Sequence, residues 1–205
     1  MDNLIYERQK TLKLNIPQSV CIVGCGGVGS WVSLFLAQLG TKNIILIDYD
    51  IVEASNLNRT PFKLEHVGWE KTEAVADLIK ERRLTCRVIQ YKEKFQDVLE
   101  KLKLFKFDYI IDCRDNLQNS NQLREMSSKY IKAGYDGLNI TVDTLKENKA
   151  WGEGEVRYQI VPSFVGAPVF LASLITNMIA TNIWNNSIYT LEINNIINTF
   201  LGGEK

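Results

Sequence analysis

The sequence between residues 20 and 48 constrains the fold more than any other part of the chain. A short apolar run, Val20–Val23, leads directly into the glycine-rich sequence GCGGVG at residues 24–29, and a second apolar run, Ile44–Asp48, ends nineteen residues after the last glycine. Glycines between a strand and a helix let backbone N–H groups approach a phosphate, and the start of the helix adds partial positive charge. The spacing therefore predicts a strand, a phosphate-binding turn, a helix and a second strand.

Short apolar runs alternate with longer helical patterns through the first two thirds of the chain, which is typical of a parallel sheet with crossover helices. Further strands are predicted at Arg87–Tyr91 and Tyr109–Asp112, and helices at Trp31–Leu39, Lys71–Arg83 and Asn116–Tyr130. Gly40 is expected to cap the first of these helices, whereas Gly134 and Gly137 are expected to break the chain after the last. We predict an α/β, Rossmann-like fold with a mainly parallel sheet and helices on both faces.

The C-terminal third has a different pattern. β-Branched and polar residues mix over residues 138–160, which favours antiparallel strands added to the sheet, with a turn or mobile loop at Trp151–Gly154. An uncharged, apolar stretch at residues 167–184 is predicted to be a helix buried in the core or at a subunit interface. Its polar interruptions and limited length argue against a membrane span. Residues 187–200 are expected to add a last strand or a short helix.

The sequence contains no linker that would divide it into independent domains. We therefore expect one domain over residues 1–205. A nucleotide-binding part would occupy residues 1–134, and residues 135–205 would contribute antiparallel strands and an apolar packing or dimer helix.

Charge balance and cysteine spacing exclude several classes of site. The chain has 24 Lys and Arg residues and 24 Asp and Glu residues, so no global field would recruit nucleic acid or an anionic membrane, and an anion site must be local. The four cysteines, Cys21, Cys25, Cys86 and Cys113, include no C-x-x-C pair, so we expect no structural zinc. The charged N-terminus does not have the pattern of a signal peptide, which favours the cytoplasm and free thiols.

The glycine-rich turn and the end of the second strand predict a bound adenine nucleotide. Gly24, Gly26 and Gly29 occupy the three positions of a dinucleotide-binding fingerprint, and Asp48 stands where a carboxylate accepts hydrogen bonds from ribose hydroxyls. These features alone do not identify a reaction. A tight turn without a ligand is the alternative.

Two cations follow closely in the sequence. The segment Ser55–Arg59 reads SNLNR, and Lys71 comes twelve residues after Arg59, at a helix start. A triphosphate needs more positive charge than a diphosphate, so Arg59 and Lys71 favour ATP. The alternative is that both are solvated surface charges.

Two carboxylates follow the fourth predicted strand. Asp112 and Asp115 stand at the edge of the sheet to which the glycine turn also belongs, where ligands of open α/β sheets bind. Magnesium prefers one or two carboxylates together with substrate phosphates, so Asp115 is a candidate ligand for magnesium bound with ATP. The alternative is that Asp115 is a helix N-cap, because it stands just before a predicted helix. Asp112 could cap or orient the same segment.

Together these motifs resemble those of the superfamily of ubiquitin-activating enzymes and their bacterial relatives ThiF and MoeB. The motifs are in the family's order and near its spacings: G-x-G-G-V-G-S at 24–30, D-x-D at 48–50, S-N-L-N-R at 55–59, G-x-x-K at 68–71 and D-C-x-D-N at 112–116. The resemblance covers residues 6–134 well and the remainder only in outline.

The resemblance implies adenylation, in which a carboxylate attacks the α-phosphate of ATP to give an acyl-adenylate and pyrophosphate. The residues that it assigns to nucleotide binding are Gly24, Gly26, Gly27, Gly29, Asp48, Asp50, Asn56, Arg59, Lys71 and Asp112. The residues that it assigns to catalysis are Arg8, Arg59, Lys71 and Asp115, with Asp115 also holding magnesium. Arg8 belongs to a Y-x-R-Q motif whose arginine can reach the phosphates of a second subunit. No side chain need act as nucleophile, because alignment and charge neutralisation suffice.

The departures from the family pattern narrow the expected activity. Thr60 stands where the family commonly has Gln, and Arg8 is nearer the glycine loop than is typical. This chain has no cysteine where thioester-forming relatives carry theirs. We read His66, the sole histidine, as a surface or loop residue. The resemblance thus implies a dimeric adenylyltransferase without its own thioester cysteine. Its substrate would be a ubiquitin-like protein, a sulfur-carrier protein or a peptide.

Two other functions stay open on the sequence. The chain could be the adenylation-type binding subunit of a heterodimeric activating enzyme, as its small C-terminal third suggests. It could also be an NAD-dependent oxidoreductase, which the glycine loop and Asp48 alone support.

Overall fold

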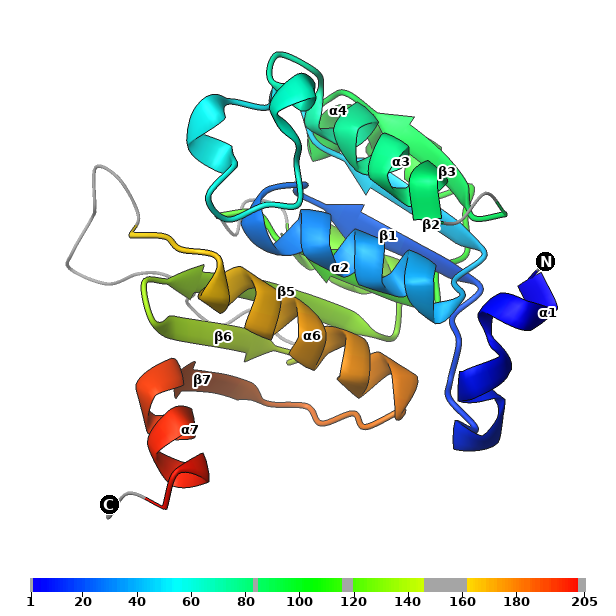
Figure 1. Ribbon diagram of the computed structural model, residues 1–205. Coiled ribbons are helices and arrows are strands. Elements are labelled where there is room, and N and C mark those ends of the chain that lie inside the picture. The colour runs from blue at the N-terminus through cyan, green and yellow to red at the C-terminus, as the bar shows by residue number, and fades with distance from the viewer. Residues whose placement is uncertain (1, 83–84, 116–119, 146–161, 203–205) are drawn as a thin grey trace.

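A computed structural model describes residues 2–82, 85–115, 120–145 and 162–202. These residues form a seven-stranded sheet in the order β3-β2-β1-β4-β5-β6-β7 (Figure 1). The strands are β1 Ser19–Val23, β2 Asn43–Ile47, β3 Arg87–Tyr91, β4 Tyr109–Asp112, β5 Tyr130–Asp136, β6 Asn139–Asp143 and β7 Ile188–Glu192. The strands from β3 to β5 are parallel to one another, and β6 and β7 are added antiparallel. The predicted fold class is confirmed.

Helices cover both faces of this sheet (Figure 1). The helices on one face are α2 Gly27–Leu39, α3 Lys71–Arg82 and α6 Gly166–Ala180. Those on the other are α4 Phe95–Leu102 and α5 Ser120–Met126. The short elements are α1 Asp2–Ile5, η1 Glu7–Leu12, η2 Ala54–Asn56, η3 Leu64–His66 and α7 Ile193–Phe200. The helix layers bury the central strands completely, which explains why those strands read as continuous apolar runs.

Alternate side chains of β1 enter two separate apolar cores. Val20 and Ile22 pack with α2 and α6, whereas Cys21 and Val23 pack with α4 and α5. This alternation follows from the two-residue period of a strand. β1 is therefore fixed from both faces, and the glycine turn that follows it starts from a rigid position.

The predicted helix at residues 116–130 extends too far. The helix α5 ends at Met126, and Tyr130 begins β5, which continues through Gly134 instead of breaking there. The burial of Lys132 explains the error, because this charged residue interrupts an apolar run yet is 0% exposed and paired with Asp112. The sequence alone does not show that pairing, so the charged Lys132 made β5 look unlike a buried strand.

The C-terminal third contains the expected antiparallel strands, β6 and β7. The apolar helix is α6, whose inward side chains belong to the main core, and residues 187–200 supply both a strand and a short helix. The predicted turn at Trp151–Gly154 lies outside the described residues. Among the described residues, no helix combines the length and the apolar character that crossing a membrane requires.

Candidate functional site

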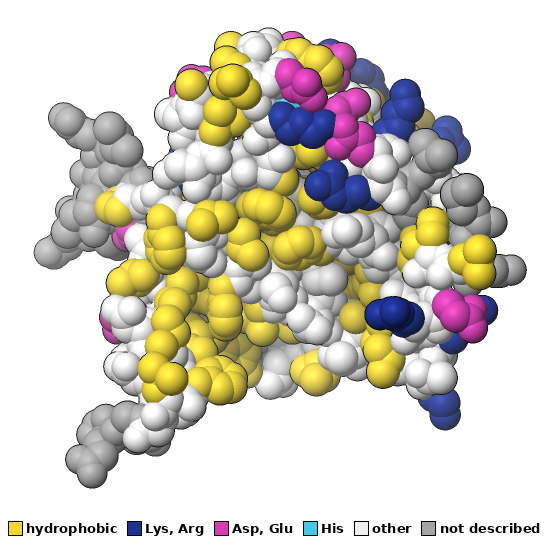
Figure 2. Space-filling view, in the orientation of Figure 1, with side chains coloured by type: hydrophobic (Ala, Val, Ile, Leu, Met, Phe, Trp, Pro, Cys, Tyr) yellow, Lys and Arg dark blue, Asp and Glu magenta, His cyan; other side chains and the backbone are white. Residues whose placement is uncertain are grey.

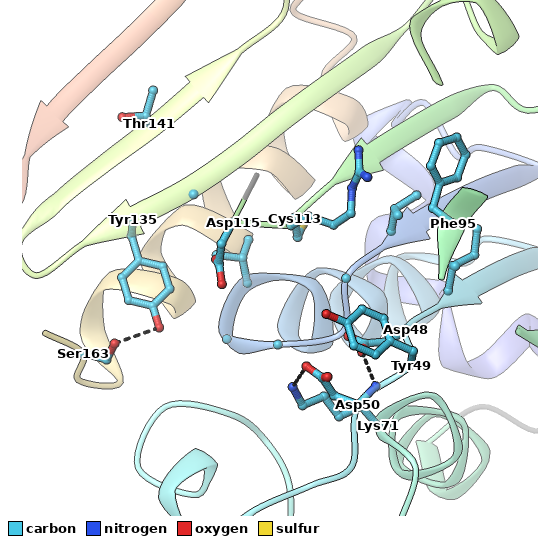
Figure 3. A pocket seen from close by; sticks show the side chains of 18 of the residues that line it. Asp48, Tyr49, Asp50, Lys71, Phe95, Cys113, Asp115, Tyr135, Thr141 and Ser163 are labelled. Carbon is cyan, nitrogen blue, oxygen red and sulfur yellow. Dashed lines mark hydrogen bonds and ion pairs between the residues drawn. The ribbon is translucent and has the colours of Figure 1, made fainter. Parts of the chain in front are cut away.

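A pocket of about 800 Å³ opens where β1, β2 and β4 end (Figure 3). The parallel register pairs Val23 with both Ile47 and Asp112, so the segments that follow these three strands lie side by side. Ligands of open α/β sheets bind at this carboxyl edge. The sheet thus assembles the glycine loop, Asp48 and Asp115 into the lining of one pocket, although they are far apart in sequence.

Steric contacts require glycine at two positions of the glycine loop. Gly24 has a φ of +92°, and its N–H donates to the carbonyl oxygen of Ile47 over 2.8 Å. A Cβ on Gly29 would lie 1.8 Å from the carbonyl oxygen of Gly24, which no side chain can tolerate. The loop is therefore held against the first turn of α2, where N–H groups without a partner in the helix point outward.

Asp48 is tied to the glycine loop by its own carboxylate. One oxygen accepts the N–H of Cys25 over 2.6 Å, and the other accepts the N–H of Asp50 over 2.9 Å. Burial raises the pKa of Asp48, although these two hydrogen bonds oppose the rise. A carboxylate offers about four acceptor sites, so Asp48 keeps capacity for the hydroxyls of a ribose.

Lys71 and Asp50 form an ion pair at the pocket wall. The Nζ of Lys71 lies 2.8 Å from an Asp50 carboxylate oxygen, and its backbone N–H donates to the carbonyl oxygen of Asp50. Lys71 is the first residue of α3, so the start of this helix faces the same space. An arriving phosphate would compete with Asp50 for this ammonium group.

Arg59 and Asn56 lie differently relative to the pocket. Arg59 lines it, and its guanidinium donates to the carbonyl oxygen of Ser55 and the side chain of Asn58. Asn56 is buried and accepts the N–H of Glu53, which stabilises the turn of η2. The described lining of the pocket does not include Asn56, so its predicted contact with a phosphate remains a prediction.

The two carboxylates after β4 also separate. Asp115 is exposed and lines the pocket, whereas Asp112 is 0% exposed and bonded to Arg114, Ser120 and Tyr130. Burial would raise the pKa of Asp112, but the Arg114 hydrogen bonds and nearby Lys132 outweigh it and lower that pKa. The described pocket lining does not include Asp112, which instead anchors the loop that carries Asp115.

Lys132 holds the same loop from the neighbouring strand. Its Nζ donates to the carbonyl oxygen of Arg114 and lies 3.6 Å from a carboxylate oxygen of Asp112. Burial lowers the pKa of Lys132, and the attraction of Asp112 opposes that change. The buried charges are thus paired, as the cost of desolvating them demands.

Arg8 does not lie near this chain's own pocket. It is exposed on η1, and the adjacent Gln9 donates to the carbonyl oxygen of Leu39 at the far end of α2. A helix of 13 residues spans about 20 Å, and the opposite end of α2 faces the pocket. A role for Arg8 at the site of a second subunit remains a prediction.

His66 was expected to be a surface or loop residue: it does lie in the loop between β2 and α3, in η3, but it is not on the surface. His66 is 0% exposed, accepts the N–H of Lys63 at Nδ1 and lies 3.2 Å from an Asp77 carboxylate oxygen at Nε2. These contacts fix the loop between Arg59 and Lys71. Spacing alone did not indicate them, because the Asp77 partner comes from α3.

The sequence did not point to several side chains that line the pocket. These are Phe95 and Lys94 at the start of α4, Arg114 after β4, Tyr135 on β5 and Ser163 before α6. The guanidinium of Arg114 lies 5.2 Å from the centre of the Phe95 ring, which fixes both side chains at one wall. Arg114 stands only at the variable position of D-C-x-D-N, and the other four residues lie outside the quoted motifs, so their places in the pocket could not be predicted.

The cysteines do not form an exposed nucleophile. All four are free thiols; Cys21, Cys25 and Cys86 are buried, and Cys113 is partly buried. Burial raises the pKa of Cys25 and that of Cys113, so both thiols stay protonated and unreactive at neutral pH. Within the described residues, no group of three His, Cys, Asp or Glu side chains could hold a metal ion.

Comparisons with known proteins show the family of this chain. The model of the ThiF family matches residues 3–145. The tRNA threonylcarbamoyladenosine dehydratase of Escherichia coli (strain K12) is 35% identical over 112 residues, which are 54% of this chain and 42% of that protein. The adenylyltransferase and sulfurtransferase MOCS3 of Drosophila virilis is 30% identical over 126 residues, or 61% of this chain and 28% of that protein.

A solved structure shows the same fold. The structure of E. coli MccB with ATP has a TM-score of 0.67 at 22% identity and covers 94% of this chain and 67% of that one. The chain spans less than half the length of the two curated relatives. The family match covers well over half of the chain, and residues from each of the five motifs line the pocket. The chain belongs to the ThiF family.

Proposed function

We propose that this chain is an ATP-dependent adenylyltransferase that converts a carboxylate to an acyl-adenylate and releases pyrophosphate. The observation that carries the proposal is the meeting of the glycine loop, Asp48, Lys71 and Asp115 in one pocket. Asp48 would bind the ribose, and the start of α2 would bind the first phosphate. Arg59 and Lys71 would bind the outer phosphates.

Asp115 fits a magnesium ion bound together with ATP. Its carboxylate is exposed at the pocket, and magnesium typically takes one or two carboxylates with substrate phosphates. When bound, magnesium neutralises charge that develops on the phosphates. In this proposal Asp112 and Lys132 act indirectly, because they position the loop of Asp115.

The reaction needs alignment more than a protein nucleophile. An oxygen of the acceptor carboxylate forms a bond to the α-phosphorus, and the bond from that phosphorus to pyrophosphate breaks. The cationic side chains Arg59 and Lys71 neutralise the leaving pyrophosphate. We propose that no thioester on this chain follows, because Cys21, Cys25 and Cys86 are buried and Cys113 is partly buried.

The acceptor that we propose is the C-terminal carboxylate of a ubiquitin-like protein, a sulfur-carrier protein or a peptide. The name of the MOCS3 relative supports a link to adenylation and sulfur transfer. We further propose a cytoplasmic dimer, in which Arg8 would serve the neighbouring pocket. The second candidate is the adenylation-type binding subunit of a heterodimeric activating enzyme.

Exchange of labelled pyrophosphate into ATP tests the proposed reaction. The assay uses magnesium and small proteins encoded beside this one, especially any that end in Gly-Gly, with a threonylcarbamoyladenosine-containing tRNA as a separate arm. We expect exchange that depends on one protein acceptor. Exchange with the tRNA alone would keep adenylation and replace the acceptor class.

Two variants give the assay its controls. Asp115→Ala should reduce the exchange rate by about a hundredfold, on the scale of removing a group that stabilises transition-state charge. Glu125→Ala removes an exposed carboxylate of α5 outside the described pocket lining and should leave the rate unchanged. Equal rates for wild type and Asp115→Ala would refute the role of Asp115.

A further inference from the structure

The pocket continues beyond the nucleotide end onto the antiparallel strands. The side chains that line this second arm come from β5, β6, β7 and the segment before α6, and include Tyr135, Asn139, Thr141, Ser163 and Thr190. Lys and Arg are absent from the described lining of this arm, whereas the nucleotide arm includes Arg59, Lys71 and Lys94. The two arms therefore suit different parts of a reacting pair.

Tyr135 stands at the junction of the two arms. Figure 3 shows its ring extending from β5 toward the start of α2, with Ser163 on one side and Asp115 on the other. A Cβ built on Gly27 would lie 2.7 Å from the hydroxyl oxygen of Tyr135. The hydroxyl thus occupies the space beside the first residue of α2, and Gly27 leaves room for it.

The present hydrogen bond of the Tyr135 hydroxyl is long. It donates to the hydroxyl oxygen of Ser163 over 3.4 Å. The carbonyl oxygen of Ser163 accepts from the side chain of Asn58, so this contact joins Tyr135 to the SNLNR segment. A phosphate oxygen is a stronger acceptor, and hydroxyl bonds to an oxyanion shorten to about 2.5–2.7 Å. An anion at the start of α2 would therefore draw this donor from Ser163.

Asp48 determines which phosphate would meet the hydroxyl. Its carboxylate is bonded to Cys25 within the glycine loop, so a ribose bound there brings the phosphate attached to it to the start of α2. We propose that the Tyr135 hydroxyl donates a hydrogen bond to the α-phosphate of the nucleotide, on the side of that phosphate that faces the second arm of the pocket. This inference rests on the proposed function and adds Tyr135 as a residue that contacts the reacting phosphate group.

Paired titrations with AMP and adenosine test this contact. Tyr135→Phe keeps the ring and removes the donor, so AMP affinity should fall about tenfold while adenosine affinity stays unchanged. Tyr189→Phe is the matched control, because Tyr189 lies on β7 and the described pocket lining does not include it. An unchanged AMP affinity, or equal losses for AMP and adenosine, would overturn the inference.

A second pair of variants tests the position of the hydroxyl without any ligand. Gly27→Ala should lower the thermal midpoint more in the wild type than in the Tyr135→Phe background. In that background the nearest ring atom is 3.1 Å from the new Cβ instead of 2.7 Å. Equal losses in both backgrounds would contradict this position. If the wild type binds neither AMP nor ATP, the proposed function fails as well; if only the Tyr135→Phe result fails, adenylation stands.

Discussion

The strands β1 and β7 belong to one sheet but are under opposite constraints. β1 pairs on both sides and is buried from Val20 to Val23, whereas all five residues of β7 are exposed and its described pairing is with β6 alone. The pocket spans both regions. Packing on both faces of the sheet holds the residues at the nucleotide end of the pocket in place. The residues of β7 at the other end are exposed, so substitutions there should disturb the fold less. Figure 2 shows that hydrophobic side chains gather over the lower part of the face in view, where α6 and α7 lie.

The largest effect is expected from Gly29→Ala at the constrained end. Its Cβ would lie 1.8 Å from the carbonyl oxygen of Gly24, so the loop or helix must move. We expect the free energy of unfolding to fall by about 3 kcal/mol, which is at the upper end of the usual cost of an overpacking substitution. Urea denaturation measures it. Gly26→Ala is the matched control, since no atom lies within 4 Å of its Cβ, and a similar loss there would contradict the steric explanation.

The next effect is expected from Asp112→Asn. This change leaves buried Lys132 without its carboxylate and should cost about 3 kcal/mol. Because the folded-state pKa of Asp112 lies below its usual 3.8, its contribution is complete above pH 3.8 and is lost as the pH falls through the lower folded value. Urea denaturation at several pH values should therefore show the two proteins converging in acid. A constant difference would contradict the ion pairing.

A smaller effect is expected on nucleotide affinity through Asp48. Its carboxylate must be ionised to accept from the ribose, and its pKa is raised above 3.8. Adenosine affinity should therefore fall, by about tenfold in total, as the pH drops through values above 3.8. The Asp48→Asn variant is the control, and its adenosine affinity should depend less on pH than that of the wild type. Parallel curves for the two proteins would exclude Asp48 from ribose binding.

The smallest effect is expected at the open end. Thr190 on β7 forms a 3.0 Å hydroxyl contact with Thr141. Thr190→Val should change the free energy of unfolding by less than about 0.5 kcal/mol, as exposed substitutions usually do. AMP affinity, measured by titration, should stay at the wild-type value. A loss as large as that of Tyr135→Phe would show that the two arms of the pocket are not separate.

The same contrast explains what the sequence could predict. The strands β1, β2 and β4 were predictable because burial on both faces gives apolar runs that end in glycine or aspartate. β5 was missed because Lys132 is buried only through its pairing with Asp112, twenty residues earlier. Tyr135 and Ser163 reach the pocket through a strand and a segment whose positions local patterns do not specify. The glycine loop and Asp48 were recognisable, because each comes at the end of an apolar run and their spacing along the chain is characteristic.

The central claim is that this pocket binds the triphosphate of ATP. Calorimetric titration of the protein with ATP and magnesium, beside a titration with NADH, tests it most directly. We predict saturable binding of ATP at one site, a loss of about tenfold in affinity in Lys71→Ala on removal of one charged hydrogen bond, and no binding of NADH. Binding of NADH with no binding of ATP would contradict the account.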